Sequence, residues 1–75
     1  MILPNEIKLI DLINVTEEEN LCTIYLYYDH KFIAYPSFKD TKNNERNKYV
    51  KSFRISPVLI NDVVRFNMTI YLYDL

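Results

Sequence analysis

Glycine and tryptophan are absent from this 75-residue sequence, and alanine occurs once, at Ala34. Without glycine, every turn that requires a positive φ must use another residue, for which Asn and Asp are best suited. The lack of glycine also excludes the phosphate-binding loops of P-loop and dinucleotide-binding proteins. Ile, Asn, Lys and Tyr abound instead, which is the bias of an AT-rich genome such as that of a low-GC bacterium, a parasite, a virus or a plasmid.

Cysteine and histidine occur once each, at Cys22 and His30. A single cysteine excludes an internal disulfide, and one Cys with one His supplies too few ligands for a closed zinc site. His30 follows Asp29 in an expected turn, where an exposed histidine is a better interpretation than a catalytic base with its orienting acid. We therefore predict no catalytic residue, no metal and no cofactor, and we expect that the protein is not an enzyme.

Long hydrophobic runs are also missing. Pro4, Asn5 and Glu6 interrupt the apolar start of the chain before the core of a signal peptide could form. No run approaches the ~18 apolar residues of a membrane span. The sequence thus predicts a cytoplasmic protein without a membrane partner. With 49% hydrophobic residues in 75 positions, residues 1–75 are expected to form one small domain.

Positive charge is concentrated in the middle of the chain. The formal net charge is −1, but residues 31–54 contain seven bases and two acids, and the same window holds five aromatic residues. Basic side chains recruit phosphates by counterion release, and aromatic rings stack with unpaired bases. The alternative is that these lysines only solvate a surface loop. The predicted nucleic-acid contacts are Lys39, Lys42, Arg46, Lys48, Lys51, Arg54, Tyr35, Phe38 and Tyr49.

The N-terminal part of the chain has an ambiguous pattern. Residues 6–15 alternate imperfectly, which favours a strand, although three isoleucines would share one side of a helix that begins at Pro4. Residues 16–20, which include three consecutive glutamates, are expected to form a solvated turn.

Residues 21–28 have the clearest strand pattern of the chain, because β-forming residues fill both faces. Residues 29–31 predict a turn into a second strand over residues 32–38, so that the two form a hairpin. Pro36 places that second strand at an edge or a bulge. A polar loop follows, and residues 49–55 then alternate as a further strand.

The C-terminal part has two competing patterns. Ser56 and Pro57 are a good helix start, an N-cap hydroxyl followed by proline at the first helical position. Against this, the sequence Thr-Ile-Tyr-Leu-Tyr of residues 23–27 returns at residues 69–73, which indicates that the tail could pair as a strand. We expect a helix from Ser56 to Asn67 and leave residues 68–75 open. The predicted fold is α+β: a small antiparallel sheet of about four strands followed by a C-terminal helix.

The run Phe32-Ile33-Ala34-Tyr35-Pro36-Ser37, followed by Lys39 and Lys42, a Tyr-containing strand and Pro57, resembles the SpoVG family of small bacterial septation and sporulation regulators. The likeness extends roughly over residues 6–73, and its specific part is this one run. The resemblance implies an α+β fold, a homodimer built across strands, and nucleic-acid binding in a regulator. The chain departs from the family in lacking its longer central hairpin, its glycines and its basic tail.

The tail carries apolar and tyrosine side chains on more faces than one small domain is expected to bury. We therefore expect a homodimer or larger assembly. The predicted interface residues are Met68, Tyr71, Leu72 and Tyr73.

Two functions are consistent with these features. The first is a small non-enzymatic nucleic-acid-binding regulator, with DNA and RNA equally open as ligands. The alternative is a viral or mobile-element interaction module that binds and inhibits a host protein through its tyrosine-rich sheet or tail.

Overall fold

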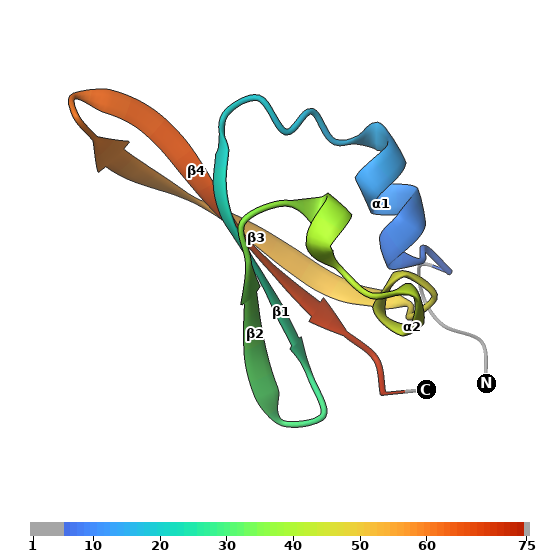
Figure 1. The fold of residues 1–75 in the computed structure, drawn as a ribbon. Coiled ribbons are helices and arrows are strands. Elements are labelled where there is room, and N and C mark those ends of the chain that lie inside the picture. The colour runs from blue at the N-terminus through green and yellow to red at the C-terminus, as the bar shows by residue number, and fades with distance from the viewer. Residues whose placement is uncertain (1–5, 75) are drawn as a thin grey trace.

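A four-stranded sheet with short helices along one side forms the body of the molecule (Figure 1). The computed structural model describes residues 6–74. Its elements are α1 (Leu9–Val15), β1 (Leu21–Tyr28), β2 (Lys31–Tyr35), the 3-10 helix η1 (Phe38–Asp40), α2 (Asn43–Arg46), β3 (Val50–Ile60) and β4 (Val63–Leu72). The strand order is β2-β1-β4-β3. The β1–β2 and β3–β4 pairs are antiparallel and the central β1–β4 pair is parallel, so the sheet is mixed.

The prediction of an antiparallel sheet followed by a C-terminal helix is wrong. β3 continues through Pro57 to Ile60, the chain turns at Asn61 and Asp62, and the tail returns as β4 between β1 and β3. The two turn residues have φ angles of 50° and 64°, as a type I′ two-residue hairpin requires. The residues on either side of the turn are mostly β-branched, which favours extended backbone over helix.

The strand predicted over residues 6–15 is also wrong from Leu9 onward, and the helical alternative is correct there. The Lys8 backbone N–H donates to the Asp11 carboxylate (3.0 Å), so the side chain of Asp11 satisfies a donor at the start of α1. Leu9 is fully buried, and Leu12 and Ile13 pack against the core. The helix therefore covers the sheet with one apolar side.

The predicted strand over residues 21–28 is confirmed with the same bounds, and Asp29 and His30 form the turn into β2. The positive φ angles of this turn, 52° and 60°, fall on an aspartate and a histidine. The two hairpin turns thus have four positions with positive φ, at Asp29, His30, Asn61 and Asp62. Three of the four are Asn or Asp, as expected for a chain without glycine.

The hydrophobic core lies between the sheet and the helices. Alternate residues of β1 and β4 point into it, because successive side chains of a strand point to opposite faces. The buried apolar residues are Leu9, Ile24, Leu26, Tyr28, Phe38, Val50, Met68, Ile70 and Leu72.

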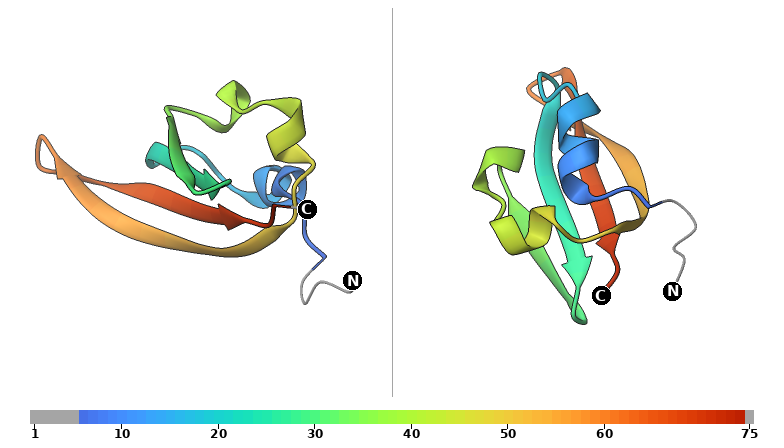
Figure 2. Two further views of the ribbon diagram at one scale, coloured as in Figure 1. Left: turned by 90° about the horizontal axis from the view of Figure 1, so that it is seen from below. Right: turned by 90° about the vertical axis from the view of Figure 1, so that its right-hand side faces the viewer.

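All three helical segments lie on the same side of the sheet, and the β3–β4 hairpin extends beyond them (Figure 2). The opposite face of the sheet carries no helix within residues 6–74. In this part of the chain no helix has the length and apolar character needed to cross a membrane.

Candidate functional site

The face of the sheet that points away from the helices, here called the open face, is built from alternate residues of all four strands. The pairing registers place odd-numbered residues of β1 and β4 beside even-numbered residues of β2 and β3 on this face. Apart from the tip of the β3–β4 hairpin, its residues are Thr23, Tyr25, Tyr27, Phe32, Ala34, Ser52, Arg54, Ser56, Val58, Arg65, Asn67, Thr69 and Tyr71.

Three aromatic rings form a cluster on the open face. Phe32 of β2, Tyr27 of β1 and Tyr71 of β4 are cross-strand neighbours. The Tyr27 ring centroid lies 4.6 Å from that of Phe32 and 5.7 Å from that of Tyr71, and the Phe32–Tyr71 distance is 6.3 Å. Rings that are tilted or edge-to-face at these separations attract one another. Phe32 is nevertheless 59% exposed, so the cluster presents aromatic surface to solvent.

Arg54 lies beside this aromatic cluster. Its Nη2 donates a hydrogen bond to the Tyr71 hydroxyl (2.9 Å), which holds the guanidinium at the edge of the rings. The four strands contain no Asp or Glu, and the charged residues of the open face, Arg54 and Arg65, are both cations. The open face thus combines aromatic surface with positive charge and carries no carboxylate on its strands.

The predicted stacking residues Phe38 and Tyr35 lie on the other side of the sheet. Phe38 is 1% exposed and belongs to the core, and Tyr35 packs against the core from β2. Both residues belong to residues 31–54, here called the basic window, but their aromatic rings serve core packing. In this structure Phe38 therefore offers no ring face to a base. The third, Tyr49, is half-buried, and the Lys8 ammonium lies 5.7 Å from its ring centroid.

The predicted basic contacts are divided among several places. Arg46 donates from Nε to the Thr41 hydroxyl (2.9 Å) and from Nη2 to two backbone carbonyls, so it holds the η1–α2 segment together. The Lys48 ammonium lies 4.8 Å from the ring centroid of Tyr28. Lys39, Lys42 and Lys51 are exposed, the first two in the η1–α2 segment and the third at the bulge of β3. Arg54 alone of the predicted set is on the open face.

The predicted interface residues of the tail are likewise divided by the alternation of β4. Met68 and Leu72 are 2% and 5% exposed and belong to the core of the molecule itself. Tyr71 is on the open face, and the Tyr73 backbone N–H donates to the Tyr49 carbonyl (2.9 Å). One face of β4 therefore buries Met68 and Leu72 within the molecule, although the sequence predicted them as interface residues.

The sequence prediction missed Tyr25, Tyr27 and Phe32 as site residues. The repeated Thr-Ile-Tyr-Leu-Tyr sequence was the available signal. As two neighbouring parallel strands, its copies place Tyr27 directly beside Tyr71 and put both on the face opposite their isoleucine and leucine residues.

Glu45 is a carboxylate buried on the helix side, with 0% exposure. It accepts hydrogen bonds from the hydroxyls of Tyr28 (2.7 Å) and Tyr35 (2.7 Å) and from the Lys42 backbone N–H (2.8 Å). Burial alone would raise the pKa of Glu45, but these three donors, together with the positive charge of Lys42, outweigh it and lower the pKa. The carboxylate therefore ties the η1–α2 segment to β1 and β2.

The pKa values of the two tyrosine hydroxyls shift upward, opposite to that of Glu45. Burial, followed by the hydrogen bond to Glu45, raises the pKa of Tyr35 from 10.0 to about 12 and raises that of Tyr28 further. A raised pKa in the folded state contributes stability below pH ~10, the unfolded value. We expect the free energy of unfolding to fall as the pH rises from about 10 to about 12. Urea unfolding of the Tyr28→Phe, Tyr35→Phe variant should show a smaller alkaline loss, and an equal loss would contradict this account.

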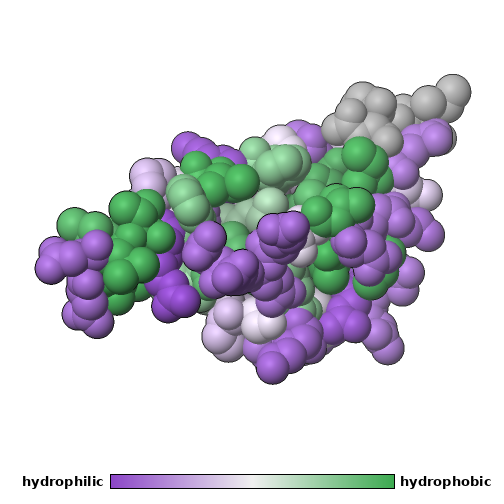
Figure 3. All heavy atoms as spheres, turned by 90° about the horizontal axis from the view of Figure 1, so that it is seen from above, coloured by the Kyte–Doolittle hydropathy of each residue, from purple (hydrophilic) through white to green (hydrophobic). Residues whose placement is uncertain are grey.

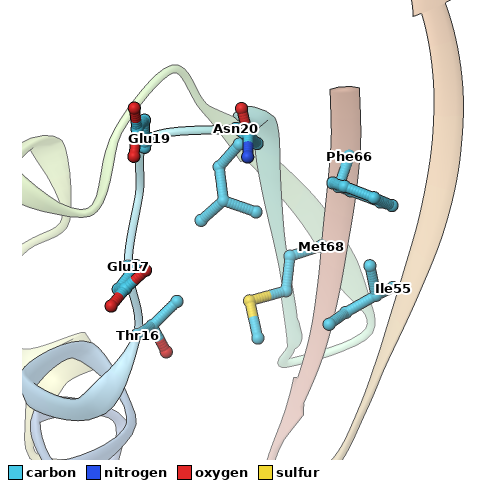
Figure 4. Close-up of a pocket in the computed structure, with 8 residues that line it drawn as sticks. Thr16, Glu17, Glu19, Asn20, Ile55, Phe66 and Met68 are labelled. Atoms are coloured by element: carbon cyan, nitrogen blue, oxygen red, sulfur yellow. The ribbon is translucent and has the colours of Figure 1, made fainter. Parts of the chain in front are cut away.

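A pocket of about 290 Å3 opens on the helix side, between the segment 16–21 and the β3–β4 hairpin. Figure 4 shows segment 16–20 facing β4, with the Met68 side chain pointing into the space between them. Its lining consists of Thr16, Glu17, Glu19, Asn20, Leu21, Ile55, Phe66 and Met68. Hydrophobic walls with two carboxylates and no basic group are unsuited to phosphate, so the open face remains the candidate for an anionic ligand.

Within residues 6–74, no three His, Cys, Asp or Glu side chains are grouped so that they could hold a metal ion.

The chain matches no protein-family model, no curated protein and no solved structure. The resemblance to the SpoVG family therefore stays a prediction.

Proposed function

We propose that the protein is a small non-enzymatic protein that binds single-stranded nucleic acid on its open face. The observation that carries this proposal is the exposed cluster of Tyr27, Phe32 and Tyr71 with Arg54 at its edge. Stacking of a base on an aromatic side chain contributes roughly 1–3 kcal/mol and tolerates any base, because every base has a π face.

The ligand is single-stranded because ring-to-base stacking requires bases whose faces are free. In a duplex each base is covered by its neighbours, whereas unpaired bases can spread onto a sheet. Tyr27 and Tyr71 lie on the two central strands, so a base on either ring lies above the middle of the open face.

Arg54 and Arg65 supply the contacts to the phosphate backbone. A guanidinium has five N–H donors, and the hydrogen bond from Arg54 to Tyr71 uses one of them. The remaining donors are available to a phosphate next to the stacked base. The four strands carry no carboxylate that would repel the ligand, although the net charge of the chain is −1.

Fluorescence anisotropy with labelled oligothymidylate and oligouridylate tests the proposal. For single strands, each phosphate contact contributes about 0.7 to the slope of log affinity against log salt concentration. We therefore expect the Arg54→Gln, Arg65→Gln variant to lower the magnitude of that slope by about 1.4, because two phosphate contacts no longer release counterions.

The variant Lys39→Gln, Lys42→Gln removes the same charge from the η1–α2 segment. It distinguishes the open face from the basic window as a whole. If this lysine variant lowered the salt slope as much as the arginine variant does, the phosphate contacts would lie on the η1–α2 segment. That result, or no binding at low salt, would contradict the proposal. Comparison of the two oligonucleotides shows whether the protein prefers DNA or RNA.

A further inference from the structure

Within residues 6–74, one edge of β3 pairs with no other strand. β3 is one of the two edge strands of the sheet and, with 11 residues, the longest strand. Its inner edge pairs with β4, with a bulge between Val50 and Ser52. On its outer side, within residues 6–74, the hydrogen bond from the Val50 N–H to the Ile7 carbonyl (2.7 Å) marks the one backbone contact at its start. An unpaired edge of this length is a template for another strand.

The hairpin turn determines which backbone groups point outward. In a two-residue hairpin the residues that flank the turn, here Ile60 and Val63, form a hydrogen-bonded pair, and such pairs alternate along the ladder. The backbone groups of the even-numbered residues of β3 therefore bond to β4. The backbone groups of the odd-numbered residues point away from β4, and these outward positions are Phe53, Ile55, Pro57 and Leu59. Of the four, Pro57 alone lacks an N–H.

The side chains at the outward positions are hydrophobic and exposed. Phe53, Ile55 and Leu59 are 49%, 53% and 67% exposed. Figure 3 shows hydrophobic side chains gathered on the projecting hairpin, at the left of the view, beyond the part of the sheet that the helices cover. An apolar stripe along an open backbone edge is the surface that a second strand would bury.

We propose that a second copy of this chain pairs with the first along β3. The two β3 strands run antiparallel about a two-fold axis at Ser56 and join the two four-stranded sheets into one. Phe53 then lies opposite Leu59 of the second copy, and Ile55 lies opposite Pro57 of the second copy. Each copy lacks one outward donor, that of Pro57.

The neighbouring registers are poorer. A side chain keeps its face only if the register shifts by an even number of residues. Moving the axis to Pro57 places both missing donors in one central pair and places Phe53 opposite Asn61, a residue of the turn. Moving it to Ile55 places Leu59 opposite Lys51, at the bulge of the strand. The register at Ser56 avoids both.

Charge also fits this register. Lys51 of one copy lies opposite Asn61 of the second copy and next to its Asp62, which is the one acidic residue of the β3–β4 hairpin. The symmetry repeats this base-to-acid contact at the other end of the interface. Complementary charges at both ends favour the register and the antiparallel direction.

Pairing within one sheet leaves both open faces on the same side. The two aromatic clusters then belong to one continuous surface, so an oligonucleotide long enough to reach both gains avidity. This consequence rests on the proposed function, whereas the pairing rests on the β3 edge alone.

A disulfide at the axis tests the register. In the Cys22→Ser background, Ser56→Cys places the sole thiol opposite its symmetry mate in a non-hydrogen-bonded pair, where the Cα atoms are about 4.5 Å apart and a disulfide can form. We expect a covalent dimer under mild oxidation. Val58→Cys in the same background is the matched control, because its Cα atoms would be about 14 Å apart. Equal cross-linking of both variants, or of neither, would overturn the proposed register.

Pro57→Val tests the edge itself. It supplies the missing N–H in both copies, so sedimentation equilibrium should give a dimer dissociation constant lower by about tenfold or more. Unchanged or weaker association, or a wild-type protein that stays monomeric at high micromolar concentration, would overturn the dimer. Oligonucleotide binding by such a monomer would leave the proposed function standing, so the two failures are distinguishable.

Discussion

Replacing Glu45 with alanine is expected to lower the free energy of unfolding by about 3 kcal/mol or more. The hydroxyls of Tyr28 and Tyr35 and the Lys42 N–H would all lose their acceptor at a site with 0% exposure. Unsatisfied buried donors and a small cavity both destabilise. Because the total stability of a small domain is of order 5–15 kcal/mol, urea unfolding followed by circular dichroism should show a large shift of the midpoint.

Two further variants make this result specific. Asp40→Ala removes an exposed carboxylate from the neighbouring 3-10 helix and should change stability by less than about 0.5 kcal/mol. Combining Glu45→Leu with Tyr28→Phe and Tyr35→Phe removes the acceptor together with two of its three donors, and should recover much of the loss. A Glu45→Ala protein as stable as the Asp40→Ala control would show that the carboxylate does not hold the η1–α2 segment to the sheet.

Replacing Tyr27 and Tyr71 with leucine is expected to weaken oligonucleotide binding by about a hundredfold, since each stacked base contributes roughly 1–3 kcal/mol. Leucine keeps an apolar side chain at both positions and removes the π face. Anisotropy titrations at low salt measure the loss, and thermal unfolding verifies that the variant is folded.

Phe66→Leu is the matched control for this experiment. It makes a comparable aromatic-to-leucine change on the other face of β4, where Phe66 lines the helix-side pocket. We expect it to bind as the wild type does. A Tyr27→Leu, Tyr71→Leu variant that binds as tightly as Phe66→Leu would exclude stacking on the open face.

Local patterns predicted the elements whose partners are near in the sequence. β1 and the turn at Asp29 and His30 follow from one run of β-forming residues and a polar dipeptide. The C-terminal helix failed because Ser56-Pro57 is a helix start in isolation, whereas in the structure Pro57 occupies the outer edge of a strand. The spacing of Ile60, Val63 and Val64 fits a helix, but it equally fits two strands around the Asn61-Asp62 turn.

The candidate site was harder to predict because it depends on register. Tyr27 and Tyr71 are 44 positions apart and become neighbours through the parallel β1–β4 pairing. The same basic window contains Phe38, which is core, and Arg54, which is on the open face. Composition therefore located cationic and aromatic residues, but the alternation of buried and exposed faces decides which of them a ligand can reach.

Aromatic proton NMR during a titration with oligothymidylate at low salt tests the open face most directly. The signals of ring protons that stack with a base shift, and the aromatic residues within the four strands divide between the two faces of the sheet. We expect the ring signals of Tyr27, Phe32 and Tyr71 to shift with the bound fraction, whereas those of the core residues Tyr28 and Phe38 stay in place. Shifts confined to the η1–α2 segment, or no shift in any ring, would contradict base stacking on the open face.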